Sequence, residues 1–233
     1  MYDTAKLKKI YSKIQKQLFY MIPEKWDRIY LYASVDEKIN NLETGEMFFY
    51  YFPKGILKKK PINVYEVPNR FNFAEDEYLE LVDELYSSIK DLKQEFIDSE
   101  MELWTNLTIK IEGFKFIIEY NFDDLTKSKY NSSQRAVIWI YNNLKIPAES
   151  MKKEDRDIIN EYLKESINFK PNIKIYSEAI YKKPVRNVIQ YKKEQVSYIY
   201  KSKKGNKLKD TNNLYKLKKG SFINERLFRN WKC

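Results

Sequence analysis

Apolar residues recur three or four positions apart in four segments of this chain, a spacing typical of amphipathic helices. The segments are 4–20, 73–98, 132–144 and 152–166. The helix predicted over 73–98 has the clearest apolar stripe, and a single face of it is expected to pack on a core. This stripe contains Tyr78, Leu81, Val82, Leu85, Ile89, Leu92 and Phe96.

The ends of these helices have recognisable signals. Asn72 stands at the N-cap position of the long helix, and Glu75 follows three residues later, as in a capping box. Ser132 or Ser133 is predicted to cap the third helix, which Pro147 would terminate.

Between the helices, apolar and aromatic residues alternate with polar ones, as in half-buried strands. Residues 27–35 and 46–52 form one predicted hairpin, and 107–111 and 114–122 form a second. The second hairpin is expected to turn at Glu112-Gly113, where glycine accepts a positive φ. Residues 64–67 are a further candidate, as a short edge strand. Because hairpins without crossover helices give antiparallel sheets, we predict an α+β fold in which amphipathic helices cover an antiparallel sheet.

Charge divides the chain into two parts. The whole sequence has a net charge of +10, but residues 1–168 carry −4 and residues 169–233 carry +14. We therefore predict a folded domain over 1–168 and a basic, lysine-rich extension over 169–233. Within the extension, Val196, Tyr198 and Tyr200 alternate with polar residues, which indicates short strands. These strands are expected to dock on the domain or to become ordered with a partner.

The residue inventory argues against an enzyme. Histidine is absent, and the only cysteine is Cys233, so the usual general base and the usual zinc ligands are missing. No phosphate-binding glycine loop or nucleophile motif occurs. We expect no catalytic activity, no metal and no cofactor. The charged first ten residues and the lack of a long apolar run predict a cytoplasmic protein without a membrane span.

Three stretches together resemble the YezG-like immunity family. They are Met21 to Ala33, Phe48 to Tyr51 ahead of the long acidic helix, and Trp104 to Thr108 leading into Phe116 to Asp124. The resemblance covers about residues 5–165 and excludes the basic extension. It implies a cytoplasmic antitoxin that binds and neutralises a nuclease toxin exported by type VII secretion in Gram-positive bacteria. It carries over no catalytic residue, because the role of the family is binding.

The long helix is the first candidate for contact with such a toxin. Residues 75–102 hold eleven acidic residues and two lysines. A nuclease presents a basic surface to phosphates, and a negative surface competes for that region. The same acids are also typical of an ordinary solvated helix face. The candidate residues are Glu75, Asp76, Glu80, Asp83, Glu84 and Asp91.

Two further groups of candidate residues, two tryptophans and the lysines of the extension, each allow more than one interpretation. Trp26 and Trp104 stand at the starts of elements, where large aromatic rings anchor interfaces or fill the core. In the extension, Lys201, Lys203, Lys204 and Lys207 lie among tyrosines, a mixture that suits single-stranded nucleic acid. The extension is otherwise a solvated tail, or a segment that contacts the toxin or the acidic helix. The alternative function is therefore nucleic-acid binding through the extension. The sequence does not determine the oligomeric state.

Overall fold

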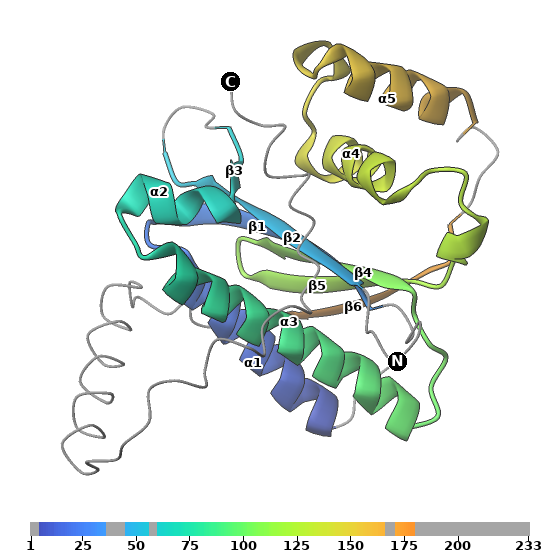
Figure 1. The fold of residues 1–233 in the computed structure, drawn as a ribbon. Coiled ribbons are helices and arrows are strands. Elements are labelled where there is room, and N and C mark those ends of the chain that lie inside the picture. The colour runs from blue at the N-terminus through green and yellow to red at the C-terminus, as the bar shows by residue number, and fades with distance from the viewer. Residues whose placement is uncertain (1–4, 36–44, 56–59, 166–170, 180–233) are drawn as a thin grey trace, which may run out of the picture.

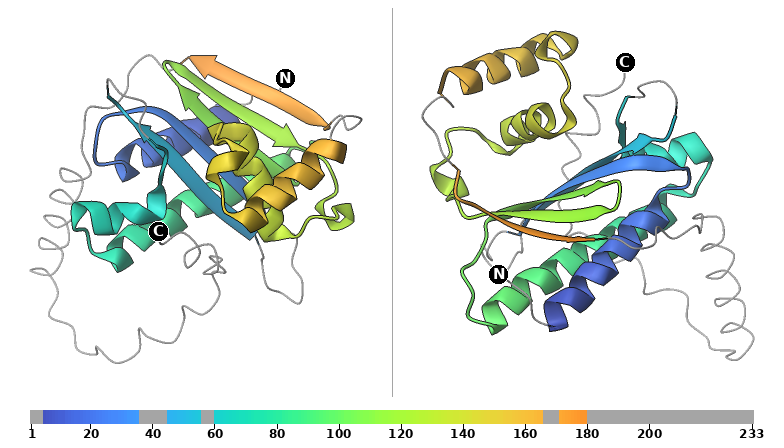
Figure 2. Two further views of the ribbon diagram at one scale, coloured as in Figure 1. Left: turned by 90° about the horizontal axis from the view of Figure 1, so that it is seen from above. Right: turned by 180° about the vertical axis from the view of Figure 1, so that it is seen from behind.

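One antiparallel sheet lies between two layers of helices (Figure 1). The computed structural model describes residues 5–35, 45–55, 60–165 and 171–179. Two long helices cover one face of the sheet and a pair of shorter helices lies over the other (Figures 1 and 2). The helices are α1 (Ala5–Met21), α2 (Val67–Phe71), α3 (Glu75–Asp98), α4 (Ser132–Leu144) and α5 (Lys153–Glu165).

The sheet has six strands in the order β3-β2-β1-β4-β5-β6, and every neighbouring pair is antiparallel. The central pairing joins β1 to β4, with Leu31 opposite Ile109. At one end β3 pairs with β2 over two residues only, whereas at the other end β6 pairs with β5 over its whole length. The strands are β1 (Trp26–Val35), β2 (Gly45–Pro53), β3 (Ile62–Asn63), β4 (Asn106–Glu112), β5 (Lys115–Asn121) and β6 (Ile173–Ala179).

The larger core lies between the sheet and the α1–α3 layer. Leu7, Ile14 and Leu18 of α1 and Leu85 and Ile89 of α3 are completely buried. They pack with the alternate strand residues that face this layer, because successive side chains of a strand point to opposite faces. Full burial of such side chains contributes about 1.5–3 kcal/mol each, so this core is the main source of stability.

The second core is aromatic and lies under α4. Tyr32 and Phe48 stack with ring centroids 4.9 Å apart, and Trp139 meets Phe48 edge to face at 5.2 Å. α5 packs on α4, and its Ile159 is buried in the same cluster. In Figure 2, α4 and α5 cover the sheet over only part of its width.

The predicted α+β fold, with its antiparallel sheet and helical cover, is confirmed. Four local predictions are wrong. The long helix begins after Ala74, which makes no side-chain cap; Asn72 instead ends α2 with φ 53°, a left-handed conformation that asparagine tolerates. The third helix is capped by Asn131, through a capping box with Gln134.

The two remaining differences concern the strands. Glu112 pairs with Lys115, so the loop of the second hairpin is Gly113-Phe114, and Gly113 has φ +58°. Phe114, expected to begin a strand, is exposed in that loop because the turn lies one residue further along. Residues 64–66 form a turn of 3-10 helix, and the edge strand precedes them as β3.

The sheet continues beyond residue 168. β6 lies in the basic extension and pairs with β5 from Asn121↔Ile173 to Lys115↔Ala179. Its Tyr176 is buried against Tyr11, with ring centroids 4.5 Å apart. The predicted domain boundary stays a prediction, but residues 173–179 pack on the domain. The strands predicted around Val196 to Tyr200 lie outside the described residues. Among the described helices, none is long and apolar enough to cross a membrane.

Candidate functional site

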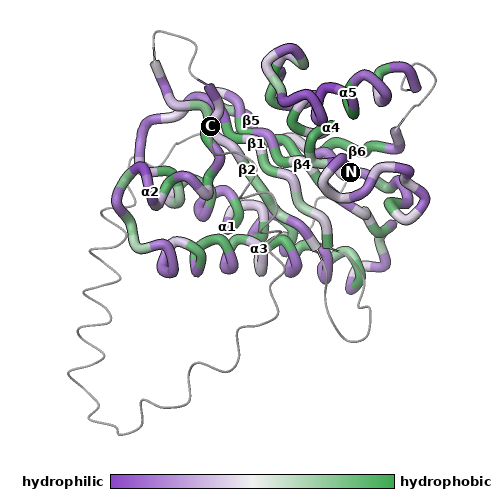
Figure 3. The backbone as a smooth tube through the Cα atoms, turned by 45° about the horizontal axis from the view of Figure 1, so that its top comes forward, coloured by the Kyte–Doolittle hydropathy of each residue, from purple (hydrophilic) through white to green (hydrophobic). Residues whose placement is uncertain are grey.

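The outward side of α3 is acidic because its apolar stripe faces the sheet (Figure 3). Tyr78, Val82 and Leu85 are buried, and the acids between them lie on the opposite side of the helix. We call the exposed acids of its first three turns the acidic surface. They are Glu75, Asp76, Glu77, Glu80, Asp83 and Glu84.

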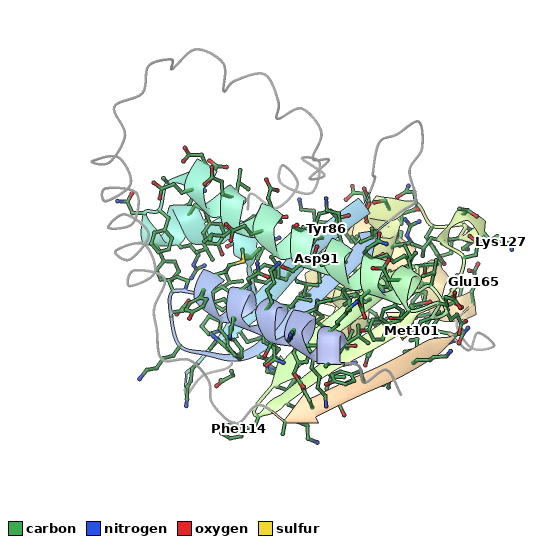
Figure 4. The ribbon with its side chains drawn as sticks, turned by 90° about the horizontal axis from the view of Figure 1, so that it is seen from below. Tyr86, Asp91, Met101, Phe114, Lys127 and Glu165 are labelled. Atoms are coloured by element: carbon green, nitrogen blue, oxygen red, sulfur yellow. The ribbon has the colours of Figure 1, made fainter. Side chains whose placement is uncertain are left out.

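The second half of α3 lies against positive charge. α1 contains five lysines and no acidic residue, and it runs beside α3 in the same layer (Figure 4). Lys13 donates to Asp91 at 3.0 Å, and Lys6 lies 3.7 Å from the buried carboxylate of Glu95. Asp91 is therefore offset within the chain, and Glu84 of the acidic surface lines a shallow hollow together with Lys13 and Lys16 of α1. Sequence reasoning missed this neighbour, although the composition of α1 was its signal.

Two tyrosines fix the position of α3. The hydroxyl of Tyr78 donates to the Met21 carbonyl at 2.9 Å, and that of Tyr86 donates to the Ser34 carbonyl at 3.0 Å. Tyr86 passes directly over Gly45, where a Cβ would lie 1.9 Å from the hydroxyl. Glycine is required there because the same Cβ would also lie 2.6 Å from the backbone carbonyl oxygen of Ser34. Hydrogen bonds to Met21 of α1 and to Ser34 of β1 therefore hold the helix that carries the acidic surface.

A partly buried phenol, that of Tyr65, lies near Asp83 of the acidic surface. Burial raises the pKa of Tyr65 well above its usual value, and the charge of Asp83 raises it further. Tyr65 stays protonated and donates to the Met47 carbonyl at 3.1 Å. The turn at residues 64–66, which precedes α2, is therefore attached to β2 by a neutral hydrogen bond.

The structure places the two candidate tryptophans differently. Trp104 is completely buried and packs edge to face on Phe96, with Lys93 4.6 Å above its ring. Its ring therefore offers no surface to a partner in this conformation. Trp26 is half-buried and stacks on Phe19 at 5.2 Å. It lies at the start of β1, on a different element from the acidic surface.

The remaining predictions concern the lysines of the extension and metal binding. Lys201, Lys203, Lys204 and Lys207 lie outside the described residues. Within the described ranges, no group of three or more acidic, cysteine or histidine side chains is arranged to hold a metal ion. The arrangement that remains is a charged surface suited to contact with a basic macromolecule.

Comparison with known proteins assigns the chain to a class. The family model described as immunity protein YezG-like matches residues 7–160, so the chain belongs to this family of immunity proteins. The matched region contains the acidic surface and all strands from β1 to β5, and it ends before β6.

Three relatives agree with this assignment. The chain is 35% identical to "Immunity protein YezG" of Bacillus spizizenii over 163 residues, which covers 70% of this chain and 96% of that protein. It is 30% identical to "Immunity protein YezG" of Bacillus subtilis, covering 66% of this chain and 97% of that protein. It is 26% identical to "Type VII secretion system protein EsaG" of Staphylococcus aureus, covering 69% and 95%. The resemblance expected from the sequence is confirmed.

Proposed function

We propose that this protein is a cytoplasmic immunity protein that neutralises a secreted nuclease toxin by binding it, and that the acidic surface forms part of the interface. The observation that supports this most directly is the exposure of six carboxylates on three turns of α3, in a chain of the immunity family. The protein acts stoichiometrically and turns over no substrate of its own.

Electrostatics supplies the mechanism. A nuclease attracts phosphates through lysine and arginine side chains, and these charges supply nearly all of its non-specific affinity for nucleic acid. A rigid array of carboxylates attracts the same region and speeds the encounter of the two proteins. The toxin is then held away from its substrate. Because α3 is fixed by Tyr78 and Tyr86, its backbone needs little further ordering on binding.

Paired charge reversal tests the acidic surface. Glu80→Lys combined with Asp83→Lys replaces attraction with repulsion on two exposed turns of α3. We expect an association rate about tenfold or more lower than wild type, together with weaker inhibition of the nuclease. The salt dependence of association should also decrease. We expect the toxin gene to lie beside this one, and binding of the toxin it encodes would be measured by surface plasmon resonance at several salt concentrations.

The control reverses a matched pair elsewhere. Glu154→Lys with Asp157→Lys has the same spacing and sign on exposed residues of α5, in the opposite helical layer. It should bind and protect like wild type. Circular dichroism must show that both variants are folded. If folded Glu80→Lys/Asp83→Lys protein protects as well as the control, the acidic surface is solvated and the interface lies elsewhere.

A further inference from the structure

The chain leaves the sheet at the end of the molecule where α3 begins. β6 ends at Ala179, which pairs with Lys115. Lys115 belongs to the β4–β5 hairpin, whose other arm ends opposite the start of β1. α1 ends just before β1, and its Met21 carbonyl accepts from Tyr78 in the first turn of α3. Figure 4 shows the arrowhead of β6 beside Phe114, on the side where α3 begins. The residues after 179 therefore start at the same end of the molecule as the acidic surface.

The distance across this end is short compared with the remaining chain. Three inter-strand steps separate β6 from β1, which amounts to about 14 Å, and the step from the sheet to the helix layer adds about 10 Å. An extended chain covers about 3.3 Å per residue, so roughly ten residues span this distance. The chain has 54 residues after Ala179. It is therefore long enough to lie along the whole acidic surface.

These two parts of the chain have complementary charge. Residues 180–233 contain 16 lysines and arginines and three acidic residues, a net charge of +13. The acidic surface has six carboxylates on three turns of one helix, and Glu77, Glu80 and Asp83 already interact with other groups of the toxin-free chain. A cationic segment joined to its own target has an effective concentration of the order of millimolar. Several individually weak ion pairs are then enough to hold it there.

We propose that residues 180–233 of the basic extension cover the acidic surface of their own chain until a toxin displaces them. The proposal rests on the function proposed above, because it gives the same surface a competitor within the chain. The extension and a nuclease offer the same chemistry, a dense group of lysine and arginine side chains. A toxin that makes additional contacts displaces the extension, whereas a protein that is merely basic does not. The extension therefore lowers the rate of binding and raises its specificity.

Carbodiimide cross-linking of the full-length protein tests this contact without any toxin. The reagent joins a carboxylate to a lysine where the two touch, and mass spectrometry of the monomer band identifies the joined residues. At low salt, most links from the lysines of residues 180–233 should lead to the acidic surface. Raising the salt to about 1 M, where the Debye length is about 3 Å, should remove these links. Glu154 and Asp157 are the control, because these exposed acids of α5 lie in the opposite helical layer and should form few links.

Two matched variants test the effect on toxin binding. The first neutralises four lysines of the extension: Lys201→Gln, Lys203→Gln, Lys204→Gln and Lys207→Gln. It should associate with the toxin about threefold or more faster than wild type, because a larger fraction of the protein then has an uncovered surface. The control removes the same charge from four exposed lysines around α5: Lys145→Gln, Lys152→Gln, Lys153→Gln and Lys164→Gln. Its rate should change little at physiological salt, where distant charges are screened.

The results distinguish this proposal from the function on which it rests. Links that lead equally to the acidic surface and to α5, or no links at all, would overturn the proposal whatever the toxin does. Slower association of the extension variant would overturn it too, because the extension would then contact the toxin directly. A rate equal to that of the control variant would show that the extension does not compete. Preferential links together with a toxin that ignores the acidic surface would support the intramolecular contact and overturn the proposed interface instead.

Discussion

At the scale of single residues, both cores contain hydrogen bonds that the burial of polar groups makes necessary. The indole N–H of Trp139 donates to the Thr108 hydroxyl at 2.9 Å, joining α4 to β4 in a buried position. The hydroxyl of Tyr120 likewise donates to that of Tyr11 at 3.0 Å. Alternation along the strands predicted that Tyr120 and Thr108 lie in a sheet. It did not predict the partners, because these come from elements 31 and 109 positions away in the sequence.

Thr108→Val tests the first of these hydrogen bonds. Valine has nearly the shape of threonine but accepts no hydrogen bond, so the buried indole N–H loses its partner. We expect the free energy of unfolding to fall by about 1–3 kcal/mol. Urea denaturation measures this, and Thr108→Ser, which keeps the hydroxyl, should lose less. Equal losses for serine and valine would show that the methyl group matters and the hydrogen bond does not.

At the scale of elements, periodicity located the helices and strands, whereas their ends depended on backbone conformation. The stripe of α3 predicted that helix correctly, but Asn72 was assigned to its start and lies instead at the end of α2. Asparagine both caps helix starts and adopts the left-handed conformation that ends helices, so the residue type alone left two outcomes. The position of the acidic surface, in contrast, was predictable from the apolar stripe. When one face of a helix is buried, the acidic residues on its other face must point outward.

Asn131→Ala tests the observed start of α4. The Asn131 side chain accepts from the Gln134 N–H at 3.0 Å, and the Gln134 side chain accepts from the Asn131 N–H at 2.9 Å. Loss of the cap should lower the free energy of unfolding by about 1 kcal/mol. Ser133→Ala, at the exposed position that the sequence also offered as a cap, should change it little. Thermal unfolding of the two variants compares them, and a larger effect at Ser133 would contradict the assigned cap.

At the scale of the whole molecule, the position of charge depends on which helices become neighbours. The sequence showed an acidic α3, but only the fold places the lysine-rich polar face of α1 beside it and offsets Asp91. The composition change near residue 169 likewise marked the extension correctly as different in charge. It gave no sign that residues 173–179 would complete the sheet, because Tyr176 is the one buried residue of that strand.

Truncation measures what β6 contributes to the domain. We expect the fragment 1–168 to unfold cooperatively, since the two cores draw most of their residues from α1 to α5 and the first five strands. It should nevertheless be less stable than the fragment 1–179 by about 3 kcal/mol, a value typical of removing a large buried aromatic side chain. Tyr176 covers Tyr11, which is completely buried in the larger core, and its loss also uncovers the edge of β5. Urea denaturation of both fragments gives the difference.

Tyr176→Ala in the fragment 1–179 should account for most of this difference in stability, because Tyr176 is the strand's main contact with the core. Identical midpoints for 1–168 and 1–179 would show that β6 adds no stability and that the domain is complete at residue 168.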